Sequence, residues 1–278
     1  MKGKTVLVTG ATSGIGKVAA QALAGMGAQV VAVGRSREKL AELRGMETLQ
    51  CDLSSLKDIQ RAAAEFRQRF KQLHVLLNNA GGVNAVREVT VDGYERTFAV
   101  NHLAYFALTN ELLDVLKASA PARIVNVASE ASRFPGAGVN LDDLQMEKRW
   151  MKMRAYGASK RLNLVFTFDL ARRLEGTGVT VNAVHPGTVY SGFGSGTGLL
   201  RIGIELYRPF MLTPEQGAET LIWLCTSPEV EGKTGGYYYK KRQIRPVGQA
   251  HDRKLQEGLW SRSAELVTRA TSPAPAAS

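Results

Sequence analysis

The sequence predicts one doubly wound α/β domain, with a central parallel sheet of about seven strands and helices on both of its faces. Apolar, β-branched runs alternate with helical patterns along most of the 278 residues. The runs are almost continuous in Val, Ile and Leu, which indicates strands that are buried on both faces, as in parallel sheets. A glycine-rich turn also joins the first strand directly to the first helix. Repeated strand–helix units of this kind give a doubly wound sheet.

Each element can be justified in chain order. The predicted strands are KTVLVTG, AQVVAVGR, ETLQCD, HVLLNNAG, ARIVNVAS, VTVNAVHPG and GGYYYK. Helices between the first six strands are predicted to begin near Gly14, Arg37, Ser55, Asp92 and Arg154. A further helix is predicted before the seventh strand, where Thr213 can cap the helix and Pro214 suits its first position.

The composition limits the classes of binding partner and the cellular compartment that we expect. The net charge of +11 favours anionic partners, but the 36 Lys and Arg residues are scattered, so we expect no nucleic-acid binding. Cys51 and Cys225 stand far apart, which argues against a disulfide framework and a zinc site, and suits the cytoplasm. The chain enters a strand pattern at once and has no apolar run near 18 residues. We therefore expect neither a secretory leader nor a spanning helix.

The turn after the first strand has the form of a phosphate-binding loop. Its glycines have the spacing G-x-x-x-G-x-G, which allows a tight turn and a close approach of the backbone to a pyrophosphate at the helix N-terminus. This context predicts a Rossmann-type dinucleotide site. The loop residues expected to contact the cofactor are Gly10, Thr12, Ser13, Gly14, Ile15 and Gly16.

The end of the second strand indicates which dinucleotide binds. A free ribose 2′-hydroxyl calls for Asp or Glu at this point, whereas a 2′-phosphate calls for Arg. Here Gly34 is followed by Arg35 and Ser36, and no carboxylate appears before Glu38. We therefore predict NADP(H), bound by Arg35 and Ser36. The alternative, in which Arg35 is only a surface charge, stays open.

Several further motifs together resemble the short-chain dehydrogenase/reductase family. They are TGATSGIG, NNAG at 78–81, Asn101, Ser129, YGASK at 156–160 and HPG at 185–187, and they follow the family's order over roughly residues 3–240. The segments VNHLAYFALT, DDLQMEKRW, HPGTV and GGYYY are similar to the retinol-dehydrogenase-like branch. Known members of that branch reduce or oxidise apolar aldehydes and alcohols.

The resemblance implies a role for each matching residue. Tyr156 would donate or accept the proton, and Lys160 would hold the nicotinamide ribose and lower the pKa of the phenol. Ser129 would bind the substrate carbonyl, and Asn101 would fix a water that relays protons to Lys160. The remaining implied cofactor contacts are Asp52, Leu53, Asn79, Ala80, Gly81, Pro186, Gly187 and Thr188.

The proton chemistry can also be argued from the residues alone. Tyr156 and Lys160 are four positions apart on a predicted helix, so they share one face. A phenol with a pKa of about 10 is a poor base near neutral pH, and a nearby ammonium favours its charged form. The predicted function is NADP(H)-dependent interconversion of an apolar aldehyde or ketone and its alcohol. The alternative is a non-catalytic protein that senses NADP(H).

The domain boundaries follow from the same patterns. We expect one dinucleotide-binding and catalytic domain over residues 1–269 and a disordered tail over 270–278. Residues 190–212 begin with glycines and continue with apolar residues and two arginines. Three interpretations stay open for this segment: a lid over a hydrophobic substrate, a peripheral membrane contact, or a helix packed on the core.

Other features carry weaker expectations. The stretch 133–154, between Ser129 and Tyr156, is longer than in many members of the family; it could shape the pocket, alter subunit contacts or form a surface excursion. Asp142 and Asp143 are interpreted as the first turn of a helix. All four histidines are predicted to be structural, and no metal site is expected. A homo-oligomer is possible.

Overall fold

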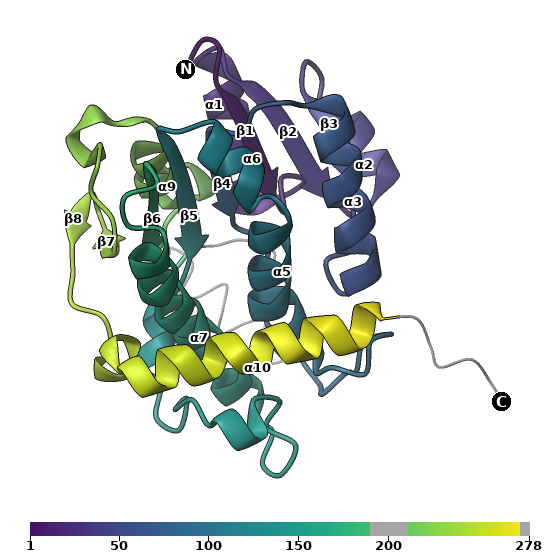
Figure 1. The fold of residues 1–278 in the computed structure, drawn as a ribbon, viewed down its shortest axis with the longest axis vertical. Coiled ribbons are helices and arrows are strands. Elements are labelled where there is room, and N and C mark those ends of the chain that lie inside the picture. Colours follow the sequence, from purple (N-terminus) through teal and green to yellow (C-terminus); the bar gives the residue numbers. More distant parts are fainter. Residues whose placement is uncertain (190–210, 273–278) are drawn as a thin grey trace, which may run out of the picture.

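The computed structural model describes residues 1–189 and 211–272 and contains one central sheet (Figure 1). The strand order is β3-β2-β1-β4-β5-β6-β7-β8. All neighbours pair in parallel except β7 and β8, which are antiparallel. The strands are β1 (Thr5–Thr9), β2 (Gln29–Gly34), β3 (Glu47–Gln50), β4 (Val75–Asn78), β5 (Ala122–Val127), β6 (Val179–Val184), β7 (Gly236–Tyr239) and β8 (Arg242–Gln243). The doubly wound fold is confirmed, with the two-residue β8 added at the edge.

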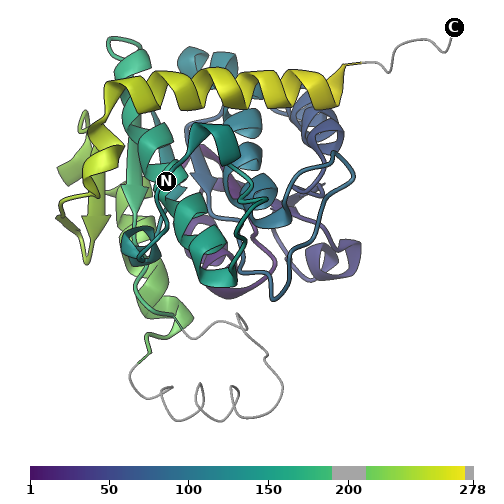
Figure 2. The ribbon, with the colours of Figure 1, turned by 90° about the horizontal axis from the view of Figure 1, so that it is seen from below.

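Helices cover both faces of the sheet (Figures 1 and 2). The α-helices are α1 (Gly14–Gly25), α2 (Arg37–Ala41), α3 (Leu56–Arg69), α4 (Arg96–Phe98), α5 (Ala104–Glu111), α6 (Leu113–Ala118), α7 (Lys152–Arg173), α9 (Pro214–Thr226) and α10 (Arg253–Thr271). A π-helical segment, η1 (Ala99–Leu103), joins α4 to α5. The short 3-10 helices are η2 (Glu130–Arg133), η3 (Leu141–Asp143), η5 (Pro228–Val230) and η6 (Gly248–His251).

Alternate residues of the strands supply two separate cores. In β1, Val6 and Val8 pack with residues of α1 and α9, whereas Leu7 packs with residues of α3, α5 and α7 on the opposite face. Successive side chains of a strand point to opposite faces, so a strand buried on both sides must be apolar throughout. This explains why the strand sequences show continuous apolar runs rather than alternation.

The predicted helix starts are close to those observed, with two differences. The fourth helix begins at Arg96 rather than near Asp92, because the Glu95 carboxylate accepts the free backbone N–H groups of Thr97 and Phe98. The helix near Arg154 starts at Lys152. Thr213 and Gln216 form a capping box at α9, as Thr213 predicts. Asp142 and Asp143 lie in the 3-10 helix η3, which Asn140 caps.

Helix α10 was not predicted, and it lies across α7, α5 and α3 (Figures 1 and 2). It extends to Thr271, which corrects the expected start of the tail at residue 270. The rest of the tail, from 273, and residues 190–210 of the proposed lid lie outside the described residues. None of the helices within the described ranges combines the length and apolar character that crossing a bilayer requires.

Candidate active site

A pocket of about 340 Å³ opens at the carboxyl ends of the strands, next to the β1–β4 boundary. The strand order reverses at this boundary, and dinucleotides bind at such switch points in doubly wound sheets. The predicted residues that line the pocket are Gly10, Thr12, Arg35, Asp52, Leu53, Ala80, Gly81 and Asn101. The fold therefore brings residues from five separate stretches of the sequence to one cavity.

The glycine loop leaves no room for a side chain at Gly10 or Gly16. Gly10 has a positive φ of 67°, and a Cβ on Gly16 would lie 2.4 Å from the carbonyl oxygen of Gly10. Asn79 closes the turn from below, since its Nδ2 donates to the carbonyl oxygen of Thr9 at 2.8 Å. Such a bare backbone turn at the start of α1 fits a pyrophosphate, which accepts hydrogen bonds from helix N-terminal N–H groups.

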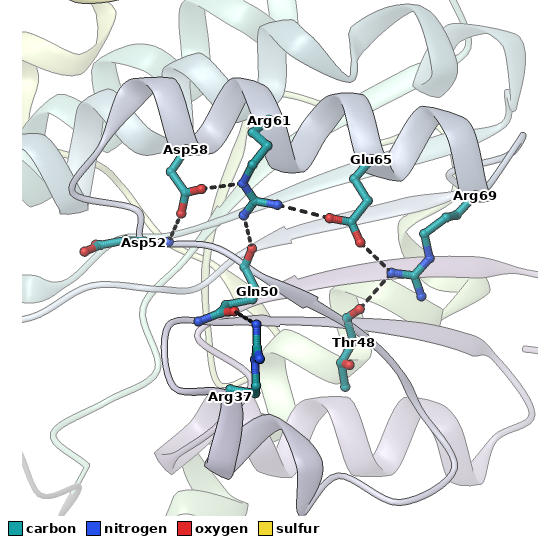
Figure 3. A network of polar contacts seen from close by, with 8 residues as sticks. All are labelled: Arg37, Thr48, Gln50, Asp52, Asp58, Arg61, Glu65 and Arg69. Carbon is teal, nitrogen blue, oxygen red and sulfur yellow. Dashed lines mark hydrogen bonds and ion pairs between the residues drawn. The ribbon is translucent and has the colours of Figure 1, made fainter.

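A polar network holds the rim of the pocket after β3, where Asp52 and Leu53 line the cavity. Figure 3 shows the side chains of this network on α3 and β3. The Asp58 carboxylate on α3 accepts the backbone N–H of Asp52 at 2.6 Å and pairs with Arg61 at 2.6 Å. Arg61 also donates to the carbonyl oxygen of Gln50 at 2.5 Å. The Gln50 side chain in turn donates to the carbonyl oxygen of Arg35 at 3.1 Å. The backbone that carries Arg35 and Asp52 is therefore held by side chains outside the pocket.

The residues predicted to be catalytic lie beside the pocket. Lys160 is buried, and its Nζ donates to the carbonyl oxygen of Val127, at the end of β5, at 2.9 Å. The same Nζ lies 5.8 Å from the ring centroid of Tyr156. A Cβ built on Gly81, in the pocket wall, would lie 3.2 Å from this Nζ and 3.0 Å from Oδ1 of Asn101. Lys160 and Asn101 thus meet at the wall of the cavity.

Burial is the main cause of the shifted pKa values of Lys160 and Tyr156. Loss of solvation lowers the pKa of Lys160 to about 7. Burial raises the pKa of Tyr156, and the Ser129 side chain opposes that rise. Ser129 also accepts the backbone N–H of Ala131 at 3.2 Å, which orients its hydroxyl at the start of η2. Without further charges, Lys160 therefore loses its proton more readily than Tyr156.

Asn101 has a structural anchor in the π-helical segment η1. Its amide Nδ2 donates to the Ser159 hydroxyl at 2.9 Å and to the carbonyl oxygen of Gly82 at 3.0 Å, and its Oδ1 accepts the Gly82 N–H at 2.8 Å. These contacts tie helix α7 to the loop after β4. Both hydrogens of Nδ2 are used by protein partners, whereas Oδ1 has one of its two acceptor sites left for a further donor such as a water.

Other predicted residues do not line the described pocket. Ser36 caps α2 by accepting the backbone N–H of Lys39, and its hydroxyl donates to Glu38 at 2.6 Å. Gly187 has a positive φ of 89° and faces Leu212. The remaining predicted residues outside the pocket lining are Ser13, Gly14, Ile15, Gly16, Asn79, Ser129, Tyr156, Lys160, Pro186 and Thr188.

Eight lining residues were missed. They are Gly34, Cys51, Ser54, Gly82, Asn84, Arg96, Thr97 and Val100. Most of them are immediate neighbours of predicted residues. Thr97 precedes Asn101 by four positions, and that helical spacing could have placed it on the same side of the pocket. Arg96 adds a second arginine beside the cavity and lies 3.4 Å from Glu88.

His102 and the stretch 133–154 have structural contacts. His102 is fully buried, its Nε2 lies 3.1 Å from the Ser263 hydroxyl, and burial lowers its pKa to about 4. The insertion packs on Glu95, which accepts from Trp150 at 3.3 Å, while its backbone N–H donates to Gln145 at 2.8 Å. Within the described residues, no cluster of His, Cys, Asp or Glu could hold a metal ion.

Comparison with known proteins identifies the family. The family model for short chain dehydrogenase matches residues 4–197, which include the glycine loop and Tyr156 with Lys160. The chain belongs to the short-chain dehydrogenase/reductase family. As an oxidoreductase of this family it uses a nicotinamide cofactor, NAD or NADP, and the bare glycine turn described above fits that group.

Relatives place this dehydrogenase in the retinol-dehydrogenase-like branch. It is 38% identical over 291 residues to retinol dehydrogenase 14 of Mus musculus, covering 96% of this chain and 86% of the relative. It is 40% identical to retinol dehydrogenase 12 of Mus musculus, covering 95% and 86%. A solved structure of an uncharacterized protein from Mycobacterium paratuberculosis matches with a TM-score of 0.78 and 32% identity, covering 96% of this chain and 94% of that one.

A second solved structure was obtained with a cofactor. It is described as an NAD(P)-dependent gluconate 5-dehydrogenase from Beutenbergia cavernae with bound NADP at low occupancy. It matches with a TM-score of 0.68 and 29% identity, covering 85% of this chain and 94% of that one. The dinucleotide-binding fold is therefore shared with a structure that contains NADP.

Proposed function

We propose that this dehydrogenase interconverts an apolar aldehyde or ketone and its alcohol with NADP(H). The observation that carries the proposal is the meeting of Tyr156, Lys160 and Ser129 beside the pocket at the carboxyl end of β5. The names of the retinol dehydrogenases among its relatives support an alcohol of apolar character.

The proposal assigns a role to the cofactor and to each residue of the site. The bound nicotinamide supplies or accepts the hydride. The Tyr156 hydroxyl exchanges a proton with the substrate oxygen, and the Ser129 hydroxyl donates a hydrogen bond to that oxygen. Lys160, when protonated, favours the phenolate and holds the cofactor ribose. The glycine loop, with Thr12 and the residues of the rim, holds the pyrophosphate and adenosine.

Substitution of Tyr156 tests the chemistry. A panel of aliphatic, aromatic and isoprenoid aldehydes is screened with NADPH by loss of the reduced-nicotinamide absorbance. Tyr156→Phe removes the proton donor and keeps the ring, so turnover is expected to fall by about 10²–10⁴-fold. Tyr238→Phe, which removes a phenol from β7, serves as the matched control. Normal turnover in Tyr156→Phe would refute the proposal.

The preference for NADP(H) rests on Arg35. This side chain is exposed at the pocket rim, and among the described residues it forms no ion pair, which suits a phosphate ligand. Arg35→Asp should shift the ratio of kcat/KM values toward NADH. Arg44→Asp changes the net charge equally but lies outside the pocket lining, so it should leave the ratio unchanged. Wild-type protein that prefers NADH would refute the cofactor assignment.

A non-catalytic NADP(H) sensor remains the competing function. It would require the glycine loop but not the group around Tyr156, so the presence of that group disfavours it. Tight NADPH binding together with inactivity on the whole aldehyde panel would favour the sensor. A cytoplasmic location, a peripheral membrane contact and a homo-oligomer are further parts of our proposal, testable by cell fractionation and by size-exclusion chromatography with light scattering.

A further inference from the structure

The Lys160 ammonium sits in an unusual environment for a buried charge. The side chain is 3% exposed. Among the described residues, no carboxylate forms an ion pair with it, and Nζ has one hydrogen bond, to the carbonyl oxygen of Val127. Buried charges normally require a partner, because loss of hydration is costly. The protonated amine therefore depends on contacts other than an ion pair.

Two aromatic rings face this ammonium. Nζ lies 5.8 Å from the ring centroid of Tyr156 on α7 and 5.7 Å from that of Tyr105 on α5. Both distances are within the range of about 6 Å at which a ring face attracts a cation. Tyr156 has its own task in the proposed reaction. Tyr105 has none so far, although it is 1% exposed and comes from a different helix.

The Tyr105 hydroxyl does not explain why this residue is present. It is buried, and it has no hydrogen-bond partner among the described residues. Burial raises the pKa of Tyr105 well above its ordinary value, with a smaller contribution from Tyr156. The phenol therefore stays neutral and offers Lys160 its ring face, not a negative oxygen. A buried hydroxyl without a partner is costly, so the benefit lies with the ring, which packs in the apolar core and faces the Lys160 ammonium.

We propose that Tyr105 is a positioning residue, whose ring face holds the Lys160 ammonium beside Tyr156 in place of a carboxylate. This inference rests on the proposed function for its catalytic consequence, though not for the contact itself. The groups that face Nζ are the rings of Tyr105 and Tyr156, the Val127 carbonyl oxygen and, through the wall at Gly81, the Asn101 amide. A neutral ring stabilises the ammonium without competing with the phenol for its proton.

The direct test measures the charge on Lys160 in the cofactor-free protein. The protein is labelled with ¹³C-lysine, the Cε signal of Lys160 is assigned by its loss in Lys160→Met, and its titration midpoint is followed by NMR. Tyr105→Leu should lower the midpoint by about one pKa unit, the size expected when a desolvated cation loses an aromatic face. Tyr105→Phe, which keeps the face and removes the hydroxyl, should keep the midpoint within about 0.3 units.

Two further variants distinguish loss of the cation–ring contact from a general loss of packing around α5. Phe106→Leu removes the next aromatic ring of α5, which faces Phe166 and Trp260, and should leave the midpoint unchanged. Pentafluorophenylalanine at position 105 keeps the ring shape but reverses the charge of its face, so it should lower the midpoint at least as far as Tyr105→Leu. A midpoint unchanged in both the Leu and the pentafluorophenylalanine variants would overturn the proposal.

Activity then separates this inference from the function on which it rests. In alcohol oxidation, a weaker ammonium leaves the Tyr156 phenol harder to ionise, so the acid limb of the kcat profile should move to higher pH in Tyr105→Leu. An unmoved acid limb would overturn the catalytic role of Tyr105. Wild-type protein without activity on any substrate would instead refute the proposed function, and the NMR result would still decide the contact.

Discussion

Replacing Gly16 with alanine tests how the glycine loop is built. The new Cβ would lie 2.4 Å from the carbonyl oxygen of Gly10 and 2.3 Å from Nδ2 of Asn79. The Asn79 amide cannot move freely, because it is hydrogen-bonded to the carbonyl oxygen of Thr9. Since carbon and oxygen atoms normally approach to about 3.4 Å, the loop must open by roughly 1 Å.

The magnitude follows from two opposing effects. Forcing a methyl group into a closely packed site costs about 1–3 kcal/mol. Alanine in a helix gains about 1 kcal/mol over glycine, so the net loss of unfolding free energy should be up to about 2 kcal/mol. Gly25, at the end of the same helix, is the matched control. A Cβ added there would meet no atom within 4 Å, and Gly25→Ala should raise stability by about 0.5–1 kcal/mol.

Urea unfolding and NADPH fluorescence titration provide the assays. Gly16→Ala should bind NADPH at least about tenfold more weakly than Gly25→Ala, because a displaced loop no longer directs its N–H groups at the phosphates and about 1.4 kcal/mol corresponds to a factor of ten. If Gly16→Ala bound NADPH as tightly as Gly25→Ala, the pyrophosphate would not lie on this turn, and our account of the loop would be wrong.

Two further predictions concern charge. Asp58→Ala removes the acceptor of the Asp52 N–H, so urea unfolding should show a loss of about 2 kcal/mol and weaker NADPH binding. Glu65→Gln, whose partners are exposed, should change stability by less than about 1 kcal/mol. The pKa of Lys160 is about 7 when folded and about 10.4 when unfolded, so the unfolded chain binds more protons between these values. Wild-type stability without cofactor should therefore rise from pH 7 to 10 relative to Lys160→Met, by at most about 4 kcal/mol; a flat difference would contradict burial of the amine.

The sheet and the loop were predictable because their signals are local. Strands buried on both faces must be apolar throughout, and a turn with a positive φ at Gly10 requires glycine. These constraints act within a few residues, so they are visible in the sequence. The same holds for the start of α9, where Thr213 and Pro214 provide both the cap and the first turn.

The missed features depend on distant packing or on weaker patterns. Helix α10 does have a signal, since Asp252 caps it and Leu255, Leu259 and Leu266 recur at helical spacing. Its role was hidden because those leucines pack on helices far away in the sequence. The polar network around Asp58 is even harder to predict from the sequence. Nothing local in QCD indicates that Asp58, on the next helix, holds the backbone of Asp52.

The spacing of Tyr156 and Lys160 illustrates where sequence reasoning stops. Four residues of helix guarantee that the two side chains are neighbours, but not that they affect each other's protons. On an exposed helix, the lysine would stay charged and water would screen it from the phenol. Here burial brings the pKa of Lys160 near neutral, and the carbonyl group of β5 and the ring of α5 face its ammonium. Its surroundings therefore come from three elements of the fold, and only tertiary packing turns a common spacing into a buried pair in which one charge affects the other residue's pKa.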